Sequence, residues 1–272
     1  MAVMASKARR FGALLFGAAL AWGPTMALPT TALAQAAPKK ITIGSSFSQT
    51  PWGFYDANQN PTGIDVSLCG GLAKEMGATA EFVNLDFKGL IPALQADRFD
   101  MICAAVYITP ERAQVVTLIP YITTSQAILA KAGTPIKALG DLCGRKVSVL
   151  QGSAQLKVVA AQSEQCAKDG KAEIQIQAFD TQPIAVRALE NGNVEAFVAS
   201  DQLVSFYLSK NPALTKAAWG INPVTLGIAV KKDNKVLADA IRAGLKQMKE
   251  KGRYAAALKE WGIENAGVAS FD

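Results

Sequence analysis

The sequence has 272 residues, half of them hydrophobic, and it carries a formal net charge of +6 with no histidine. So mild a positive charge, without any run rich in lysine and arginine, argues against nucleic acid and anionic membranes as partners. The lack of histidine and of any C-x-x-C motif disfavours a metal site or a redox cofactor, and we expect no cofactor.

The chain opens with the pattern of a cleavable secretion signal. A short basic segment precedes an apolar run at residues 11–22, which is shorter than the roughly 20 residues that a membrane-spanning helix needs. Small residues at 32–36 offer two overlapping A-x-A cleavage sites, and we favour the second. We therefore expect residues 1–36 to be removed as a signal peptide and residues 37–272 to be released into the periplasm.

From residue 40 onward, patterns typical of strands and helices alternate, which indicates an α/β fold with largely parallel sheets. In the first half we expect strands at 40–44, 80–85, 100–106 and 125–130, and helices at 64–76, at 89–97 and from Thr109 onward. In the second half we expect strands at 146–150, 173–178, 194–199 and 225–230, and helices from Gly152-Ser153 onward and at 183–190, 201–208, 235–251 and 254–261. This order predicts two α/β lobes, with the last strand and helices free to return to the first lobe.

All four cysteines lie in the expected exported part, where disulfides form by default. Cys143 and Cys166 flank one strand–helix segment, and we expect them to pair. Cys69 and Cys103 each lie in apolar sequence, so a bridge and two buried free thiols both fit this pair.

The segment from Thr109 to Arg112 is the most informative candidate site. Threonine suits a helix N-cap and Pro110 suits the first helical position, which places Arg112 in a first turn where the helix dipole disfavours a cation. A surface ion pair with Glu111 or Glu81 would explain the arginine as a minor structural feature. Because Arg112 follows the carboxyl end of a buried strand, where open α/β sheets bind ligands, we interpret it as a bidentate site for a carboxylate.

A set of motifs in chain order resembles the polar amino-acid-binding branch of bacterial periplasmic solute-binding proteins of ABC importers (family 3). The motifs are FKGLIPALQ at 87–95, FD at 99–100, ITPERA at 108–113, GIDV at 63–66, VLQGS at 149–153, and Gly252 followed by KEWG at 259–262. The resemblance spans nearly the whole expected mature chain, and the ordered set is more specific than any single motif.

The resemblance implies a two-lobed, type II periplasmic-binding-protein-like fold with two crossover strands as its hinge. Lobe 1 would comprise residues 37–125 and 222–272, and lobe 2 residues 126–221. The lobes would close on an amino acid or a similar small carboxylate and deliver it to an inner-membrane ABC permease. Nothing in the sequence indicates a dimer, so we expect a monomer.

By resemblance, Arg112 binds the α-carboxylate of the ligand and Phe87 supplies a ring platform. Backbone groups would assist, namely the N–H groups at Tyr107, Ser153 and Ala154 and the carbonyl oxygen of Ala105, which would face the α-ammonium. The side-chain pocket would also draw on Ser46, Gln49, Trp52, Leu150 and Gln151. None of these is ionised, which favours a neutral polar or partly apolar amino acid over a charged one.

In this family a carboxylate binds the α-ammonium of the ligand, and here it would follow the strand at 194–199. The register places Ser200 there, with Asp201 one residue later. Either Asp201 serves after a small shift, or no carboxylate reads the α-amino group.

The main alternative is an enzyme on the same fold, similar to cyclohexadienyl dehydratases. Such an enzyme needs a placed acid, and the candidate site residues supply no obvious one. We therefore expect no enzymatic activity and no catalytic residues.

Overall fold

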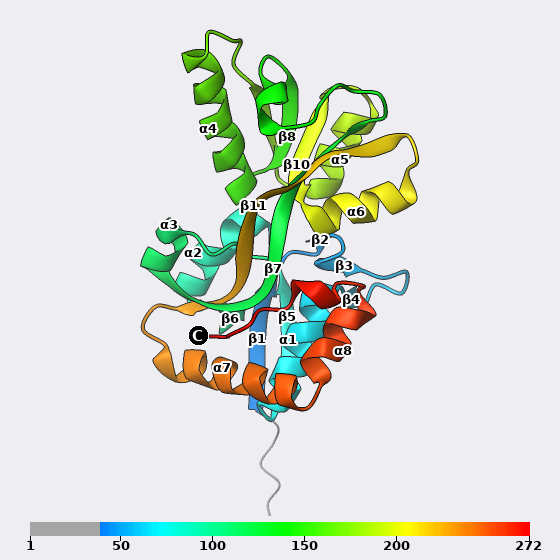
Figure 1. The fold of residues 1–272 in the computed structure, drawn as a ribbon. Coiled ribbons are helices and arrows are strands. Elements are labelled where there is room, and N and C mark those ends of the chain that lie inside the picture. Colours follow the sequence, from blue (N-terminus) through cyan, green and yellow to red (C-terminus); the bar gives the residue numbers. More distant parts are fainter. Residues whose placement is uncertain (1–38) are drawn as a thin grey trace, which may run out of the picture. The chain divides into compact units, whose positions relative to one another are not determined.

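The computed structural model describes residues 39–272, so the expected signal peptide lies outside the described residues (Figure 1). An eight-stranded sheet with the order β5-β1-β6-β11-β7-β10-β8-β9 runs through this part of the chain. Two long strands, β7 (Val116–Lys131) and β11 (Leu214–Lys231), lie antiparallel at its centre. Within residues 39–272, no helix combines the length and apolar character that crossing a membrane requires.

The first lobe is built on three parallel strands: β1 (Lys39–Ser45), β5 (Ala78–Asn84) and β6 (Met101–Ile102). Helices pack on its two faces: α1 (Ile64–Glu75), α7 (Lys235–Glu250) and α8 (Arg253–Glu260) on one, and α2 (Leu90–Gln95) on the other. Helix α7 is held there by an apolar stripe, because Ile241, Leu245 and Met248 recur every three or four residues and are all buried. The last helices therefore pack on the first lobe.

The second lobe has strands β8 (Lys146–Leu150), β9 (Gln175–Phe179) and β10 (Ala196–Ser200). Its helices are α4 (Ala154–Lys168), α5 (Gln182–Glu190) and α6 (Asp201–Lys210). Strand β10 is buried on both faces: Val198 packs in the cluster that contains α4, while Phe197 packs in the cluster that contains α5 and α6. Figure 1 shows α4 on one side of this sheet and α5 and α6 on the other.

Short elements complete the described chain. A small three-stranded sheet contains β2 (Ser48–Gln49), β3 (Gly53–Tyr55) and β4 (Pro61–Thr62). Helix α3 (Pro110–Val115) precedes β7, and 3-10 turns cover Phe87–Gly89, Leu139–Leu142 and Glu264–Ala266.

Several expectations about the strands were wrong. The sheet is mixed rather than largely parallel, because the three pairs formed by β6, β11, β7 and β10 at its centre are antiparallel. Strands β7 and β11 are 16 and 18 residues long, far longer than the predicted strands at 125–130 and 225–230. The prediction was too short because Pro120, Gly220 and Pro223 interrupt the strand pattern in the sequence. The predicted strand at 100–106 ends at Ile102, and Ala105 has a positive φ of 48° that no strand tolerates.

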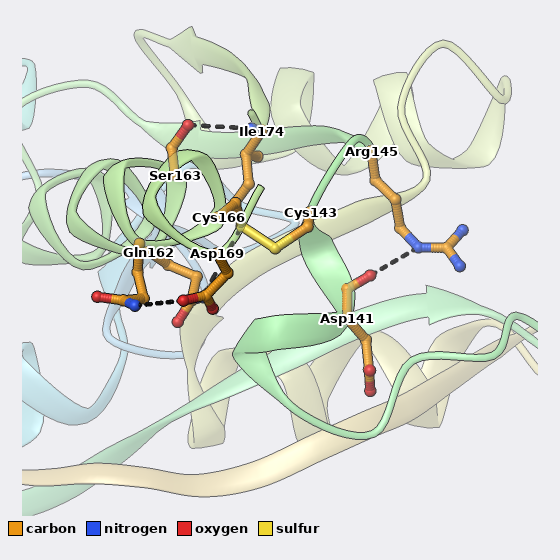
Figure 2. Close-up of a disulfide and its surroundings, with 9 residues drawn as sticks. Asp141, Cys143, Arg145, Gln162, Ser163, Cys166, Asp169 and Ile174 are labelled. Carbon is orange, nitrogen blue, oxygen red and sulfur yellow. Dashed lines mark hydrogen bonds between the residues drawn. A yellow bond between two sulfur atoms is a disulfide. The ribbon is translucent and has the colours of Figure 1, made fainter. Parts of the chain in front are cut away.

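Both cysteine pairs are bonded. Cys143–Cys166 ties the segment before β8 to α4, and close to it the hydroxyl of Ser163 on the same helix accepts a hydrogen bond of 3.0 Å from the backbone N–H of Ile174 (Figure 2). Cys69–Cys103 ties α1 to the segment after β6, so the alternative of two buried free thiols does not hold in the structure.

A buried carboxyl group supports the segment that contains Ala105. Asp65, in the first turn of α1, accepts a hydrogen bond of 2.5 Å from the Tyr121 hydroxyl, and its backbone N–H donates to the carbonyl oxygen of Trp52. Burial raises the pKa of Asp65 to about 7, and hydrogen bonds from Tyr121 and from the N–H of Ala105 offset this only in part. Asp65 therefore links three segments of the first lobe while its carboxyl group is largely protonated below neutral pH.

We expect replacement of the Cys143–Cys166 disulfide by two serines to lower the free energy of unfolding by roughly 3 kcal/mol, because the bridge closes a loop between residues 23 apart. Urea denaturation under oxidising conditions measures the loss. The single change Ser209→Ala, at an exposed hydroxyl on α6, is the control and should leave the midpoint unchanged. An unchanged midpoint in the double variant would contradict the expectation.

Asp65 should make the protein less stable as the pH rises. The Asp65 carboxyl group loses its proton near pH 3.8 in the unfolded chain and near pH 7 in the folded chain. The contribution of protonated Asp65 to the free energy of unfolding is therefore complete below about pH 4 and is lost between pH 4 and 7. The loss should be on the order of 4 kcal/mol. Urea denaturation at pH 4.5 and 7.5 should show a smaller pH dependence in Asp65→Asn than in the wild type, whereas Asp239→Asn, at an exposed carboxylate of α7, should behave as the wild type. Identical pH dependence in Asp65→Asn and the wild type would rule out this role.

Candidate functional site

A small cavity lies where the first and second lobes meet, with a volume of about 20 Å³. Twelve residues line it: Gln49, Trp52, Phe87, Ala105, Tyr107 and Arg112 from the first lobe, and Leu150, Ser153, Ala154, Gln155, Gln182 and Ser200 from the second. Ten of them are residues that the sequence predicts at the site. The elements that bear them explain this convergence, because β8, β9 and β10 of the second lobe end, and α4 and α5 begin, at this edge of the sheet.

A larger groove of about 440 Å³ lies beside α7, between residues such as Lys40, Met76 and Val236. None of the predicted site residues lines it. The small cavity is the better candidate site because polar groups from both lobes converge there.

Arg112 connects the two lobes at this cavity. Thr109 is the N-cap of α3, and its hydroxyl accepts a hydrogen bond of 3.4 Å from the Arg112 N–H, as the sequence predicts. The guanidinium donates to the carbonyl oxygen of Tyr107 in the first lobe at 3.0 Å and to that of Gly152 in the second lobe at 3.1 Å. Its central carbon lies 5.4 Å from the centre of the Phe87 ring. Three of the five N–H donors stay available for a ligand.

The charge of Arg112 has no acidic partner in the part of the chain that the structure describes. Glu111 forms its ion pair with Lys157, and Glu81 forms its ion pair with Lys40. Burial lowers the pKa of Arg112, and the charge on Glu111 offsets this in part. The simple surface-pair explanation therefore does not apply, and a desolvated cation faces the cavity.

Backbone N–H groups lie beside the guanidinium. Ser153 caps α4 by accepting from the Leu156 N–H at 3.2 Å, which leaves the N–H groups of Ala154 and Gln155 without a partner inside the helix. The N–H of Ser153 itself donates to the carbonyl oxygen of Leu150. Free N–H groups at the start of a long helix favour a bound anion.

Tyr107 offers a further N–H. Ile108 and Val106 bond to β11, and the residue between them pairs with Leu226 without exchanging hydrogen bonds. In such a pair, the N–H and C=O of Tyr107 point away from β11, toward the side on which Arg112 binds the carbonyl. The Tyr107 hydroxyl accepts a hydrogen bond of 2.8 Å from Nε2 of Gln155, and burial raises the pKa of this hydroxyl.

A second set of bonds between the lobes shares no residue with the Arg112 set. Nε2 of Gln182 donates to Oε1 of Gln49 at 3.2 Å, and the indole N–H of Trp52 donates to the Ser200 hydroxyl at 2.9 Å. These four side chains are all buried and all line the cavity. Trp52 therefore lines the candidate site as well as packing in the core.

Three predicted site residues do not line the cavity. Asp201 is the first residue of α6 and forms an ion pair of 2.7 Å with Lys216. Its neighbour Ser200, at the end of β10, lines the cavity. The hydroxyl of Ser46 lies 3.2 Å from that of Ser48. Gln151 continues the pairing of β8 with β9 through its backbone N–H.

Gln155 and Gln182 also line the cavity, although the sequence motifs did not predict them. Both stand in the first turn of a helix that directly follows a strand of the second lobe. That position was a usable signal, because the strand–helix junction before Gln155 had already been assigned to the site through Ser153 and Ala154.

Residues 41–264 match the family model of bacterial extracellular solute-binding proteins, family 3. ABC transporter arginine-binding protein 1 of Escherichia coli is 29% identical over 231 residues, which are 83% of this chain and 91% of the relative. An ancestral arginine-binding protein bound to arginine superimposes with a TM-score of 0.78 at 32% identity, over 82% of this chain and 98% of that one. An ancestral arginine-binding protein bound to glutamine gives a TM-score of 0.77 at 33% identity, over 83% of this chain and 98% of that one.

These comparisons confirm the family and the fold class that the motifs predict. The ordered motifs lie within the matched residues, and the two lobes joined by β7 and β11 correspond to the type II architecture. The chain belongs to the bacterial extracellular solute-binding proteins of family 3.

Proposed function

We propose that this protein is the substrate-binding component of an amino-acid ABC importer, which captures an amino acid or a similar small carboxylate and delivers it to a membrane permease. The observation that carries the proposal is Arg112, a partly buried cation between the lobes with unused N–H donors and no acidic partner among residues 39–272. The relatives named for arginine, among them a solved structure with bound arginine and another with bound glutamine, support an amino acid as the ligand.

The ligand carboxylate would bind to Arg112 and to the backbone N–H groups of Tyr107 and Ala154. Hydrogen bonds to a charged group in a closed, water-poor cavity contribute about 1.5–3 kcal/mol each. Phe87, Trp52 and Leu150 would form the walls around the rest of the ligand. Ser46, Gln151 and Asp201 lie outside this cavity and take no part in the proposed contacts.

Binding would work by closure of the lobes about β7 and β11. The pairing of these strands is irregular between Ala218 and Val224, and Gly220 and Asn222 have positive φ angles. This irregular segment supports the predicted lobe boundaries, with residues 126–221 moving as lobe 2 against residues 37–125 and 222–272. A ligand that bonds to both lobes favours the closed state by its differential affinity for that state.

We propose that ligand binding takes place in the periplasm, after residues 1–36 have been removed. The family description as extracellular and the two disulfides support export to an oxidising compartment. We propose that the mature chain acts as a monomer in complex with its permease.

Binding is favoured over catalysis by the chemistry of the cavity. An enzyme of the dehydratase type needs an acid or base within reach of the substrate. Among residues 39–272, the side chains that line the cavity include no carboxyl group, and the burial that raises the pKa of Tyr107 keeps its hydroxyl neutral. This composition suits recognition of a carboxylate better than proton transfer.

We expect Arg112→Ala to weaken binding by at least 100-fold, because the carboxylate loses two or more charged hydrogen bonds. A thermal-shift screen of the common amino acids identifies the ligand, since a ligand that binds only the folded state raises the melting temperature. Calorimetry then compares the variants, with circular dichroism as the check that Arg112→Ala is folded. Arg98→Ala, at an exposed arginine of the first lobe, should bind as the wild type. Unchanged affinity in Arg112→Ala would refute the carboxylate site.

A further inference from the structure

The amide groups of Gln49 and Gln182 form a pair inside the cavity that their mutual hydrogen bond satisfies only in part. Gln49 lies in β2 of the first lobe, and Gln182 is the first residue of α5 in the second lobe. They are 4% and 6% exposed, both line the cavity, and Nε2 of Gln182 donates to Oε1 of Gln49 at 3.2 Å. Within residues 39–272, Nε2 of Gln49 and Oε1 of Gln182 are buried without a hydrogen-bond partner.

The number of free groups does not depend on how the two amides are oriented. Each carboxamide has one acceptor oxygen and one donor NH₂ group, and a single bond between two carboxamides uses one of each. One donor and one acceptor group are therefore left over if either pair of atoms is exchanged. A buried polar group without a hydrogen-bond partner destabilises the protein, so a ligand that satisfies both groups is strongly favoured.

We infer that Gln49 and Gln182 bind the side chain of the ligand and select an amino acid whose side chain ends in a neutral carboxamide. A carboxamide presents a donor and an acceptor in one plane, so it can bond to Oε1 of Gln182 and to Nε2 of Gln49 at once. This inference rests on the proposed function, in which Arg112 holds the carboxylate. It adds Gln182, which lies in the second lobe, as a residue that determines specificity.

The charges in the cavity disfavour the other classes of side chain. Arg112 is the one charged residue among those that line the cavity in the described chain, and the ligand carboxylate uses it. A guanidinium or ammonium side chain would be buried without an anion, which is costly. A carboxylate side chain would face the Gln182 oxygen without a donor between them, and an apolar side chain would leave both amide groups unpaired.

The alternative is that the hydrogen bond of this pair only holds the lobes together, as a latch. Such a latch would stabilise the closed state to the same degree with every ligand. If the pair binds the side chain of the ligand instead, it changes the ratio of affinities between ligands. Glutamine and methionine are matched probes, because their unbranched side chains have similar length and only glutamine has the amide.

Calorimetry on the mature protein tests the inference with L-glutamine, L-asparagine, L-glutamate, L-methionine and L-arginine. We expect glutamine or asparagine to bind the wild type at least 100-fold more tightly than any of the other three. In Gln49→Met and in Gln182→Met, the affinity for the preferred amide should fall at least tenfold relative to that for methionine. Gln165→Met, at an exposed glutamine of α4, should keep the wild-type ratio.

The outcomes separate this inference from the proposed function. If no amino acid or small carboxylate binds, the proposed function fails. If arginine, glutamate or methionine binds best and the binding depends on Arg112, the proposed function stands and this inference is overturned. It is also overturned if the two methionine variants weaken all ligands equally, since the pair is then a latch. Binding of methionine by the variants shows that they are folded, and a melting temperature close to that of the wild type supports this.

Discussion

The contacts between the two lobes at the cavity centre on one partly desolvated guanidinium. Arg112 bonds to carbonyl oxygens of both lobes but to no carboxylate in the described chain, so its charge is hydrogen-bonded and not neutralised. The other bonds between the lobes are either neutral, as between Trp52 and Ser200, or exposed ion pairs, as between Lys88 and Asp180. Neutral bonds contribute about 1 kcal/mol each and exposed ion pairs less. An anion from outside is therefore the strongest single addition to the closed state.

The position of Arg112 follows from the local chain geometry. The strand at the centre of the first lobe stops at Ile102, and the chain then turns through Ala105 with its positive φ before Thr109 starts α3. The hydrogen bonds of Asp65 and the disulfide at Cys103 hold this turn in place. The fold thus fixes the backbone on both sides of the site, and the cavity lies where the ends of strands and the starts of helices meet.

The sequence predicted the parts of this structure that depend on local signals. Thr109 and Pro110 mark the start of α3 by capping preferences that act within one turn, and the apolar stripe of α7 places it against the first lobe. The lengths of β7 and β11 could not be predicted, because prolines and glycines within them break the local pattern while pairing between distant segments restores the strand. The same limit applies to the site. Arg112 and Phe87 were predicted because they lie in contiguous motifs, whereas the contact of Gln49 with Gln182 joins residues 133 apart.

Asp201 shows why residue type alone was not enough to assign the charges. It lies one residue beyond Ser200, and this single step moves its carboxylate from the end of β10 into α6, where Lys216 neutralises it. The cavity consequently keeps the positive charge of Arg112 and otherwise presents neutral donors and acceptors among the residues described. Under the proposed function, selection in such a site would depend on matching hydrogen bonds rather than charges. Matching neutral groups can still discriminate strongly, because a buried group that loses its partner costs more than a satisfied bond contributes.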